Sequence, residues 1–513
     1  MTSHARLWHF HGGLRLPEHK SESTTLPIAT LALPAQLVLP LVQHIGVAAE
    51  PLVKVGDRVL KGQLIARAGN NISAPVHASS SGIVSAIEPR AVPHPSGLPV
   101  TCIVIATDGL DEWITPSPGS SDPCRLPAEE IRTRVRDAGI VGLGGAGFPT
   151  HVKLNPGAGH LIETLIINGA ECEPYISCDD MLMREHAREV VEGARIMRHA
   201  VHAAHCIIGI EDNKLAARAA LLHALTELGE FNIRVITVPT RYPTGGEKQL
   251  IKVLTGREVP SQGRPLGIGV LCHNVGTAVA VYRAVVLGQP LISRIVTVTG
   301  AGVARPQNFA VPLGAPISSL IAAAGGYTMP QPQLFMGGPM MGLPLPDDSL
   351  PVIKTTNCIL ALPARPVEPE LPCIRCGECV KVCPANLLPQ ELFWHARARD
   401  FDKAQDQHLF DCIECGCCDA VCPSHIPLVR YFRYAKTEIW TSEKERRKSD
   451  IARQRHEARL ARQERDKVER AARLQKHKPE LHSSEAPDVD PKKAAVQAAL
   501  ERVKAKQQST EEP

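Results

Sequence analysis

The amino-acid sequence predicts a multidomain protein of mixed α/β and α+β class. An all-β domain comes first, followed by an α/β domain, a small α+β domain, a cysteine-rich domain and a charged tail. Three observations lead to this prediction. Short β-branched runs alternate with glycine turns over residues 35–107, strand-like and helix-like runs alternate after residue 161, and one cysteine pattern occurs twice late in the chain. A chain of 513 residues can form several domains that each bury their own core.

The composition excludes some classes of protein. The net charge is +4, and 39 glycines and 43 prolines accompany 44% hydrophobic residues, which is ordinary for turn-rich globular domains and gives no reason to expect a nucleic-acid partner. Residues 1–13 lack the apolar core of a signal peptide, so we expect a cytoplasmic protein. The longest apolar stretch, 268–287, contains His273, Asn274 and Arg283. We therefore expect no transmembrane segment, and any membrane role would be peripheral.

The first predicted domain covers residues 1–115. Within it, β-branched runs at 52–59, 62–65 and 82–87 are separated by glycine turns, which is typical of a small all-β unit. A Ser/Pro/Gly-rich linker at 116–127 ends the domain.

The second predicted domain covers residues 125–290. Helical spacing at 129–138 leads into a glycine-rich loop, and strands are expected at 165–168, 206–210 and 233–238 with helices at 181–200 and 214–228. This alternation favours a mostly parallel sheet flanked by helices.

The glycine-rich loop at 142–147 satisfies G-x-G-x-x-G, but its context does not fit a dinucleotide fingerprint. A helical segment precedes the loop, whereas the fingerprint follows a strand. Glycines at this density still leave backbone N–H groups free to approach a phosphate, and Lys153 adds a positive charge. A simple tight turn is the alternative interpretation.

A third domain is predicted at 291–345, with a strand at 295–300 and a short helix at 316–324, and a glycine–methionine loop lies at 336–342. Residues 363–372 lead into the cysteine-rich domain at 363–440, where a helix-like run spans 387–404 between the two cysteine motifs. The tail at 441–513 is rich in Arg, Lys, Glu, Ala and Gln, and it is expected to be either a solvated helix or disordered.

Two copies of C-x2-C-x2-C-x3-C-P give the strongest signal in the chain. In this pattern three cysteines hold one 4Fe-4S cluster and the fourth reaches the neighbouring cluster. The first cluster is therefore assigned to Cys373, Cys376, Cys379 and Cys422, and the second to Cys412, Cys415, Cys418 and Cys383. Only Cys418 keeps the required spacing, so the adjacent Cys417 is interpreted as a bystander, with a swap between the two left open.

A pair of structural zinc sites is the alternative interpretation of repeated C-x2-C motifs. It is disfavoured because each cysteine triplet is completed only by exchange with the other motif. The remaining cysteines are interpreted as packing residues; they are Cys102, Cys124, Cys172, Cys178, Cys206, Cys272, Cys358 and Cys417.

Several segments resemble known families. V-x-V-G-D-x-V-x-x-G-Q at 53–63 and A-P-x-x-x-x-x-x-G-x-V at 74–84 are similar to biotinyl and lipoyl carrier domains, which have a barrel-sandwich fold, but the expected hairpin tip at 68–71 contains no carrier lysine. The loop at 142–153 looks like the flavin loop of the NADH-binding, FMN-carrying subunit of respiratory complex I. Segments 168–174, 242–250 and 274–277 continue that resemblance, and 298–314 resembles its ubiquitin-like β-grasp (SLBB) domain. The cysteine-rich domain resembles a two-cluster bacterial ferredoxin.

This resemblance implies cofactors and residue roles. It implies a Rossmann-like flavin domain that binds FMN, with the backbone of Gly144, Gly145 and Gly147 and the charge of Lys153 at the phosphate. Asn168, Glu171 and Glu247 would line the same pocket. Ala170 and Gly246 replace acidic residues of that family, so the resemblance supports flavin binding more strongly than NADH binding. For Glu171, Glu173 and Glu247, solvated or helix-capping roles remain the alternative.

The order of domains resembles the C subunits of the Rnf (Rsx) electron transport complex. This implies a peripheral subunit on the cytoplasmic side of the inner membrane that carries electrons between NADH, flavin and two 4Fe-4S clusters, with the other subunits as partners and ion translocation in the complex. A flavin is needed there because a nicotinamide exchanges electron pairs whereas a cluster takes single electrons. A soluble NADH-diaphorase-type subunit and a scaffold with an unused flavin pocket remain alternative hypotheses.

Overall fold

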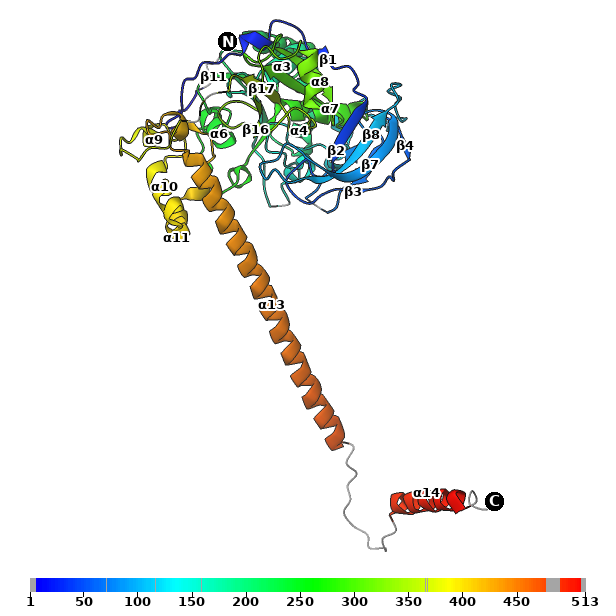
Figure 1. Ribbon diagram of the computed structural model, residues 1–513. Coiled ribbons are helices and arrows are strands. Elements are labelled where there is room, and N and C mark those ends of the chain that lie inside the picture. The colour runs from blue at the N-terminus through cyan, green and yellow to red at the C-terminus, as the bar shows by residue number, and fades with distance from the viewer. Residues whose placement is uncertain are drawn as a thin grey trace. The chain divides into compact units, whose positions relative to one another are not determined.

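The computed structural model describes residues 6–70, 72–115, 117–157, 159–364, 366, 368–476 and 490–508. The chain divides into two compact units, Met1–Ile439 and Trp440–Pro513. Parts of several predicted segments lie outside the described residues: positions 1–5 of the start, Asn71 of the hairpin tip, Pro116 of the linker, 365 and 367 before the cysteine-rich domain, and 477–489 and 509–513 of the tail. The elements of the first unit carry the candidate site (Figure 1).

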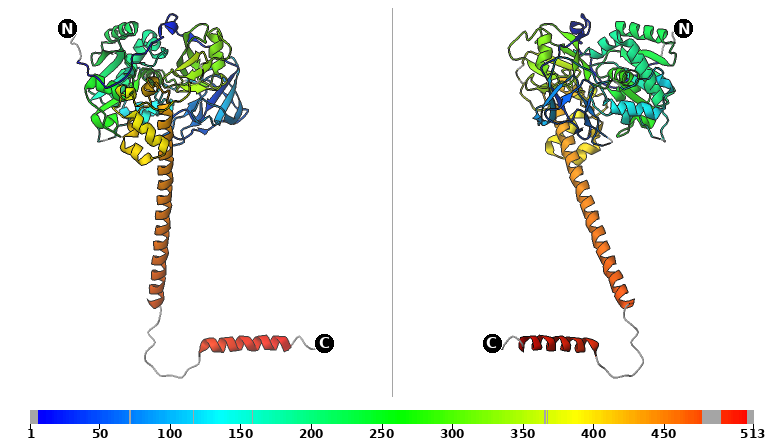
Figure 2. Two further views of the ribbon diagram at one scale, coloured as in Figure 1. Left: turned by 60° about the vertical axis from the view of Figure 1, so that its left-hand side comes forward. Right: turned by 90° about the vertical axis from the view of Figure 1, so that its right-hand side faces the viewer.

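The β domain consists of two antiparallel sheets. One has the order β2 (Gln36–Pro40), β8 (Val100–Thr107), β7 (Gly82–Arg90), β4 (Arg58–Val59), and the other has the order β3 (Glu50–Pro51), β5 (Leu64–Arg67), β6 (Val76–His77). Because side chains alternate across a strand, Leu37 and Leu39 of β2 point to the same side and are fully buried with Ile103 and Ile105 of β8. These strands, blue in Figure 2, form the carrier-like part of the chain.

The α/β domain is built on a parallel sheet with the order β11 (Ile233–Val238), β10 (His205–Glu211), β9 (Thr164–Gly169), β12 (Val270–Asn274). Its helices are α1 (Ala128–Asp137), α2 (Thr150–Lys153), α3 (Cys178–Glu185), α4 (Ala187–Ala200), α5 (Leu215–Glu227), α6 (Glu247–Thr255) and α7 (Val275–Val286). The chain leaves β9 toward β10 and β11 and later returns to its other side at β12. The carboxyl ends of β9 and β12 therefore flank a topological switch point, where sheets of this kind bind ligands.

The helix expected at 181–200 is two helices. The break falls at His186, whose backbone lies outside the helical region, and whose Nδ1 lies 2.8 Å from Glu189 Oε1 in the first turn of α4. A local side-chain contact of this kind competes with the helical backbone pattern. The strands expected at 165–168, 206–210 and 233–238 are present as β9, β10 and β11.

The next sheet has six strands in the order β1 (Ala29–Thr30), β14 (Gln307–Pro312), β13 (Ser293–Thr299), β17 (Cys358–Leu362), β15 (Gln333–Met336), β16 (Leu343–Leu345), with α8 (Ile317–Ala323) beside it. Its first strand, β1, belongs to the N-terminal segment, by which we mean the described residues 6–30. This segment also contacts the α/β domain, because Trp8 N donates to Val253 O and Leu14 forms a β-bridge with Tyr242. The N-terminal segment therefore spans two domains before the β domain begins.

The cysteine-rich domain has its own core, which includes Leu392, Phe393 and Phe432. It contains the short helices α9 (Glu378–Lys381) and α12 (Cys417–Ala420), and the helix-like run at 387–404 is α10 (Pro389–Ala398) and α11 (Phe401–Asp406). Arg399, in the left-handed region with φ of 58°, ends α10. The cysteine-rich domain also contains the short 3-10 helix Leu409–Asp411, and further 3-10 helices of the described residues lie at Ser21–Ser23, Pro123–Arg125 and Pro265–Ile268.

The tail is helical where it is described. Helix α13 runs from Leu428 to Lys476 and α14 from Pro491 to Gln508, and the described side chains of both are exposed beyond residue 450. Of the two alternatives, the solvated helix is confirmed over these ranges. Over the described part of the chain, every helix is too short or too polar to cross a bilayer.

Candidate functional site

The two cysteine motifs have the same backbone conformation. Arg375 and Glu414, at equivalent positions 39 residues apart, have φ of 58° and 57°, and Gly377 and Gly416 have φ of 78° and 75°. In each motif the amide two residues after the first cysteine donates to that cysteine's sulfur, Arg375 N to Cys373 Sγ and Glu414 N to Cys412 Sγ, both at 3.4 Å. Such N–H···S bonds favour thiolate charge and are one means by which proteins set cluster potentials.

The predicted ligand sets surround two separate cavities. The first cavity is lined by Cys373, Cys376, Cys379 and Cys422, together with Gly377, Gln390 and Pro423. The second is lined by Cys383, Cys412, Cys415 and Cys418, together with Cys417, Gly416 and Pro384. In both cavities the fourth cysteine comes from the other motif, so the donor sets fit two cross-ligated clusters.

The two cavities differ in exposure. Cys376 is exposed, and the neighbouring Ile374 is 68% exposed, so the first cavity lies near the protein surface. Cys383, Cys415 and Cys418 are buried.

Cys417 and Cys418 both border the second cavity, but they pack in different directions. Cys418 belongs to the core of the cysteine-rich domain and is packed with Cys383. Cys417 belongs to a separate cluster with Tyr242 and Cys415, which faces the α/β domain. Since the assigned ligand Cys415 packs with Cys417, the choice of Cys418 as the ligand rests on the motif spacing.

Tyr242 joins the α/β domain to the second cysteine motif. Its ring is 3% exposed, and its hydroxyl donates to Cys415 O at 2.7 Å. Further along the same loop, Gly245 N donates to Cys172 Sγ at 3.2 Å, and Gly245 O accepts from Asn168 Nδ2 at 2.8 Å. The loop therefore contacts a predicted cluster ligand at one end and a predicted flavin residue at the other.

Asn168 and Asn274 lie at the carboxyl ends of the two strands that flank the switch point. Asn168 is paired in register with Asn274 across β9 and β12. The Asn274 side chain caps α7 by accepting from Gly276 N at 2.8 Å, and it donates to Asp179 at 2.6 Å. The structure thus places the predicted Asn168 at the sheet edge where a flavin is expected.

The glycine-rich loop lies against the same edge. Leu143 N donates to Thr277 Oγ1 at 3.0 Å, and a Cβ on Gly144 would come within 3.2 Å of the Asn274 side chain. Gly145, with φ of 106°, faces open space, and Gly147, with φ of 63°, leaves no room for a side chain beside Thr355. The loop thus offers an open glycine backbone beside the first turn of α7, where Thr277 lies. Such an arrangement suits an anion such as a phosphate.

Lys153 and Glu247 lie together beside this loop, with Nζ 2.6 Å from Oε1. Lys153 ends α2, directly after the glycine-rich loop, and Glu247 begins α6, directly after the loop of Tyr242. Both side chains are partly exposed, at 29% and 41%. Among the predicted flavin residues, the structure thus places Gly144 beside Asn274, Asn168 beside Gly245, and Lys153 beside Glu247.

Glu171 has a different environment. It caps α3, because its carboxylate accepts from Asp179 N at 2.6 Å and from Asp180 N at 3.3 Å. Burial raises the pKa of Glu171 to about 8, against the opposing charge of Lys20. The helix-capping alternative fits Glu171 in the described structure, because both bonds of its carboxylate go to the first amides of α3.

The environments of Lys20, Glu173 and Cys172 could not be recognised from local sequence. Lys20 Nζ donates to the carbonyls of Glu171, Glu173 and Ile176, at 2.7, 2.8 and 2.5 Å. Glu173 accepts from the amides of Met340 and Met341 at 2.7 and 2.9 Å, and its pKa is raised by burial. Burial likewise raises the pKa of Cys172 to about 12, so its thiol stays protonated.

Models of four domain families match the chain in the order of the structure. They are described as the RnfC barrel sandwich hybrid domain (residues 8–110), the Nuo51 FMN-binding domain (135–283), the SLBB domain (295–344) and the 4Fe-4S dicluster domain (372–426). These matches confirm the predicted fold class and the predicted cofactor types, FMN and 4Fe-4S clusters. NADH as a substrate stays a prediction.

A solved NAD+-reducing [NiFe]-hydrogenase in the H2-reduced state also resembles the chain. The two are 19% identical, with a TM-score of 0.43, over 61% of this chain and 63% of that one. A likeness of this size carries no argument about function.

Curated relatives match nearly the whole chain. The C subunit of the ion-translocating oxidoreductase complex of Serratia proteamaculans is 48% identical over 98% of this chain and 70% of its own length. The C subunits of the same complex from Erwinia tasmaniensis and Citrobacter koseri are 49% and 48% identical, over 98% and 99% of this chain and 61% and 71% of their own lengths. The chain thus spans about two thirds of the length of these relatives. It belongs to the family of C subunits of the ion-translocating oxidoreductase complex, which is the Rnf complex.

Proposed function

We propose that this chain is the peripheral electron-transfer subunit of a membrane-bound, ion-translocating oxidoreductase complex. It carries electrons between NADH and the other subunits through FMN and two 4Fe-4S clusters. Its relatives are named as subunits of this complex and match nearly the whole chain, which supports membership of the complex. The order of the FMN-binding and 4Fe-4S domains supports the path of the electrons. We place the subunit on the cytoplasmic side of the inner membrane, where NADH is present.

We assign these tasks to domains at 1–115, 125–290, 291–345 and 363–440. A tail at 441–513 follows them. Gly144, Gly145, Gly147 and Lys153 would hold the FMN phosphate, and Asn168 and Glu247 would lie beside the ring. When bound, FMN exchanges an electron pair with a nicotinamide and single electrons with a cluster. Glu171 supports this site indirectly by capping α3.

The cysteines would hold the clusters in the cross-ligated sets that surround the two cavities. The first set is Cys373, Cys376, Cys379 and Cys422, and the second is Cys412, Cys415, Cys418 and Cys383. Zinc is disfavoured because the fourth cysteine of each set comes from the other motif, as in two-cluster ferredoxins.

The hydrogen bond from Tyr242 to Cys415 carries the proposal. It fixes the buried second cavity against the loop whose other end contacts Asn168, so the flavin residues and one cluster site form a continuous packed region. The first cavity lies farther out, with Cys376 and Ile374 exposed. A site that receives electrons inside the subunit and a site that passes them to a partner need this difference in burial.

The proposal is tested on anaerobically purified full-length protein. We expect about eight iron and eight sulfide per chain, one FMN released by acid, and bleaching of both chromophores by NADH. Zinc in place of iron and sulfide would refute the cluster assignment. Clusters without flavin or NADH bleaching would instead favour the scaffold. Co-purification with integral-membrane subunits distinguishes the proposal from a soluble diaphorase, which would purify with soluble partners.

A further inference from the structure

Cys383, assigned to the second cluster, lies in a turn that the N-terminal segment holds by two hydrogen bonds. Val382 O accepts from Gly13 N at 2.8 Å, and Cys383 O lies 3.0 Å from His11 Nδ1. Because a carbonyl oxygen can only accept, the Nδ1 atom of His11 carries the hydrogen in this contact. Two neighbouring carbonyls of the turn are therefore held by donors from the far end of the chain, with 372 positions between His11 and Cys383.

Gly12, between these two donors, packs directly against the same turn. It is buried, and its φ of 67° lies in the left-handed region that favours glycine. A Cβ atom here would come within 2.5 Å of the carbonyl carbon and oxygen of Val382 and within 2.7 Å of the carbonyl carbon of Cys383. The backbone conformation and the close approach both require glycine, so the segment and the turn are in direct backbone contact.

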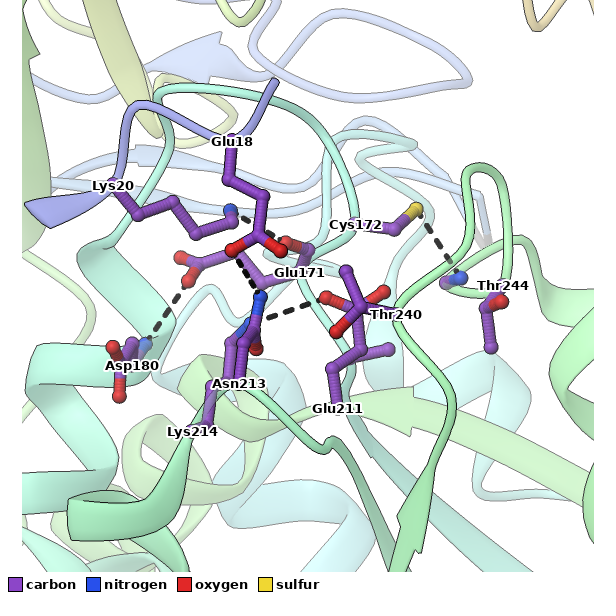
Figure 3. Close-up of polar contacts among 12 residues, drawn as sticks. Glu18, Lys20, Glu171, Cys172, Asp180, Glu211, Asn213, Lys214, Thr240 and Thr244 are labelled. Atoms are coloured by element: carbon purple, nitrogen blue, oxygen red, sulfur yellow. Dashed lines mark hydrogen bonds and ion pairs between the residues drawn. The ribbon is translucent and has the colours of Figure 1, made fainter. Parts of the chain in front are cut away.

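The N-terminal segment is itself fixed to the α/β domain. Trp8 N donates to Val253 O at 3.0 Å, and Lys20 Nζ donates to the carbonyl of Glu171 at 2.7 Å. Figure 3 shows the second of these anchors, with Lys20 directed at Glu171. The anchors lie on both sides of residues 11–14, so fixed neighbours impose the contacts with the turn.

The same segment reaches the second cysteine motif through Tyr242. Leu14 and Tyr242 exchange two backbone hydrogen bonds, at 2.7 and 2.8 Å, and the Tyr242 hydroxyl donates to Cys415 O. Cys383 and Cys415 come from different motifs, but both are assigned to the second cluster. Residues 11–14 therefore support ligands of one cluster in both motifs.

The equivalent turn of the second motif, at 421–423, is held within its own domain. Cys422, which corresponds to Cys383, accepts at its carbonyl oxygen from His425 N at 3.1 Å. Over the residues that the structure describes, no hydrogen bond joins 421–423 to another domain. The two motifs have the same backbone conformation, so the support from the N-terminal segment distinguishes the second cluster from the first.

Holding the turn also fixes the sulfur of Cys383. Leu387 N donates to Cys383 Sγ at 3.3 Å, and N–H···S bonds of this kind help to set the reduction potential of a cluster. The carbonyl groups of the turn are dipoles beside the same ligand, so their donors also contribute to the local field. A displaced turn would change both the position of the sulfur and this bond.

We propose that His11 and Gly12 are positioning residues for the second cluster. Neither lines the second cavity, so both act through Cys383, and by holding its turn they set the reduction potential and the retention of the cluster. The inference rests on the proposed function for the identity of the clusters. It gives a role at the cluster site to a segment that the predicted boundaries place in the domain at 1–115.

The first experiment removes the donor of His11 in the full-length holoprotein. In His11→Leu we expect a shifted midpoint potential for one cluster in an EPR-monitored redox titration at fixed pH, with the other signal unchanged. The shifted signal should be the one that Cys412→Ala abolishes, since Cys412 belongs to the second set. His11→Asn should restore the wild-type potential, because asparagine Nδ2 is a donor at about the same distance from the backbone as histidine Nδ1.

His9→Leu is the matched control for this experiment. His9 is an exposed histidine two residues earlier in the same segment, so the substitution is identical but leaves the donor to Cys383 in place. It should leave both potentials unchanged.

The second experiment displaces the segment from the turn. We expect Gly12→Ala to shift the same potential as His11→Leu and to lower the iron and sulfide contents by up to about half, because one of two clusters depends on this turn. Gly97→Ala is the matched control. Gly97 has a similar φ of 63°, but no atom lies within 4 Å of the position of its Cβ, so it introduces the backbone strain without the contact. It should leave both clusters as in the wild type.

The outcomes separate this inference from the proposed function. Unchanged potentials in both His11→Leu and Gly12→Ala, in protein that contains two clusters, would refute the positioning role and leave the proposed function intact. A shift confined to the signal that Cys412→Ala leaves intact would also refute it, because the turn would then serve the first cluster. Wild-type protein without iron and sulfide would refute the proposed function, and this inference with it.

Discussion

Lys153 and Glu247 form an ion pair with 2.6 Å between Nζ and Oε1, although 94 residues separate them in the chain. Each was predicted as a flavin-binding residue from a different motif, and the fold brings the two side chains into contact. Because both side chains are partly exposed, the pair contributes little to stability. The ammonium of Lys153 can therefore turn from the carboxylate to a phosphate at low cost.

Replacing Lys153 should weaken FMN binding without unfolding the protein. We expect Lys153→Ala to raise the dissociation constant of FMN about tenfold, because a charge-assisted contact to the phosphate is lost. The measurement is titration of flavin-depleted protein, followed by the fluorescence of the flavin. Lys252→Ala is the matched control, since Lys252 lies on α6 and pairs with Glu258 at 2.9 Å away from the loop. Equal FMN affinity in the two variants would contradict the role of Lys153.

Removing the Tyr242 hydroxyl should alter one cluster and spare the other. In Tyr242→Phe the buried carbonyl of Cys415 loses its donor, which changes the electrostatic field at the second cluster. We expect a shift in the midpoint potential of one cluster in an EPR-monitored redox titration, with the second signal unchanged. Tyr431→Phe, which loses a hydroxyl contact to Glu370 on the surface of the same domain, should shift neither. Unaltered potentials in Tyr242→Phe would contradict the proposed contact between the domains.

Local spacing and long-range contacts were not equally predictable. The cysteine motifs could be interpreted from sequence because cluster geometry dictates their spacing. The strands β9, β10 and β11 were predicted because buried parallel strands consist of continuous apolar runs. The contact of Tyr242 with Cys415 joins residues 173 positions apart, and neither residue has a local pattern that indicates the other. The same holds for Lys20, whose partners lie more than 150 residues away. The motif of Glu171 predicts a ligand role, and only the position of α3 shows that its carboxylate also caps this helix.

Cross-ligation predicts which cluster depends on Cys422. In Cys422→Ala we expect loss or conversion of the cluster held by Cys373, Cys376 and Cys379, because the four thiols surround one cavity. The Mössbauer or EPR signal of the buried second cluster should persist, with its Tyr242-dependent potential intact. If Cys422→Ala instead removes the Tyr242-sensitive signal, each motif ligates its own cluster and the exchange of the fourth cysteine is wrong.

Cys417 and Cys418 should respond oppositely to alanine substitution. Cys418 packs with Cys383 in the cysteine-rich core, whereas Cys417 packs toward Tyr242. We expect Cys418→Ala to lose about half of its iron and sulfide, since one of two clusters would lack a ligand, and Cys417→Ala to retain nearly all of both. Iron and sulfide analysis of protein purified without oxygen checks this. Loss of iron in Cys417→Ala with retention in Cys418→Ala would mean that the two residues exchange roles.

Lys354 connects two domains through a buried amine. It is 1% exposed, and its Nζ donates to Pro75 O in the β domain at 2.7 Å and to Gly139 O in the α/β domain at 2.8 Å. Burial lowers the pKa of Lys354 from 10.5 to about 7. A neutral amine has two hydrogens, which is enough for these two carbonyls, so the contact persists when the proton is lost.

The lowered pKa makes the contribution of Lys354 to stability depend on pH. Between about pH 7 and 10.5 the unfolded chain holds a proton on this amine that the folded chain lacks, so stability should rise with pH across this window. Lys354→Met removes this dependence, along with the two hydrogen bonds. We therefore expect the melting temperature of the variant, relative to that of the wild type, to fall as the pH is raised from 7 to 9. His77 nearby does not interfere, because burial lowers its pKa to about 3, outside this range. Lys252→Met, at a partly exposed ion pair, is the control whose difference from wild type should stay constant, and a constant difference for Lys354→Met as well would show that the buried amine keeps its proton.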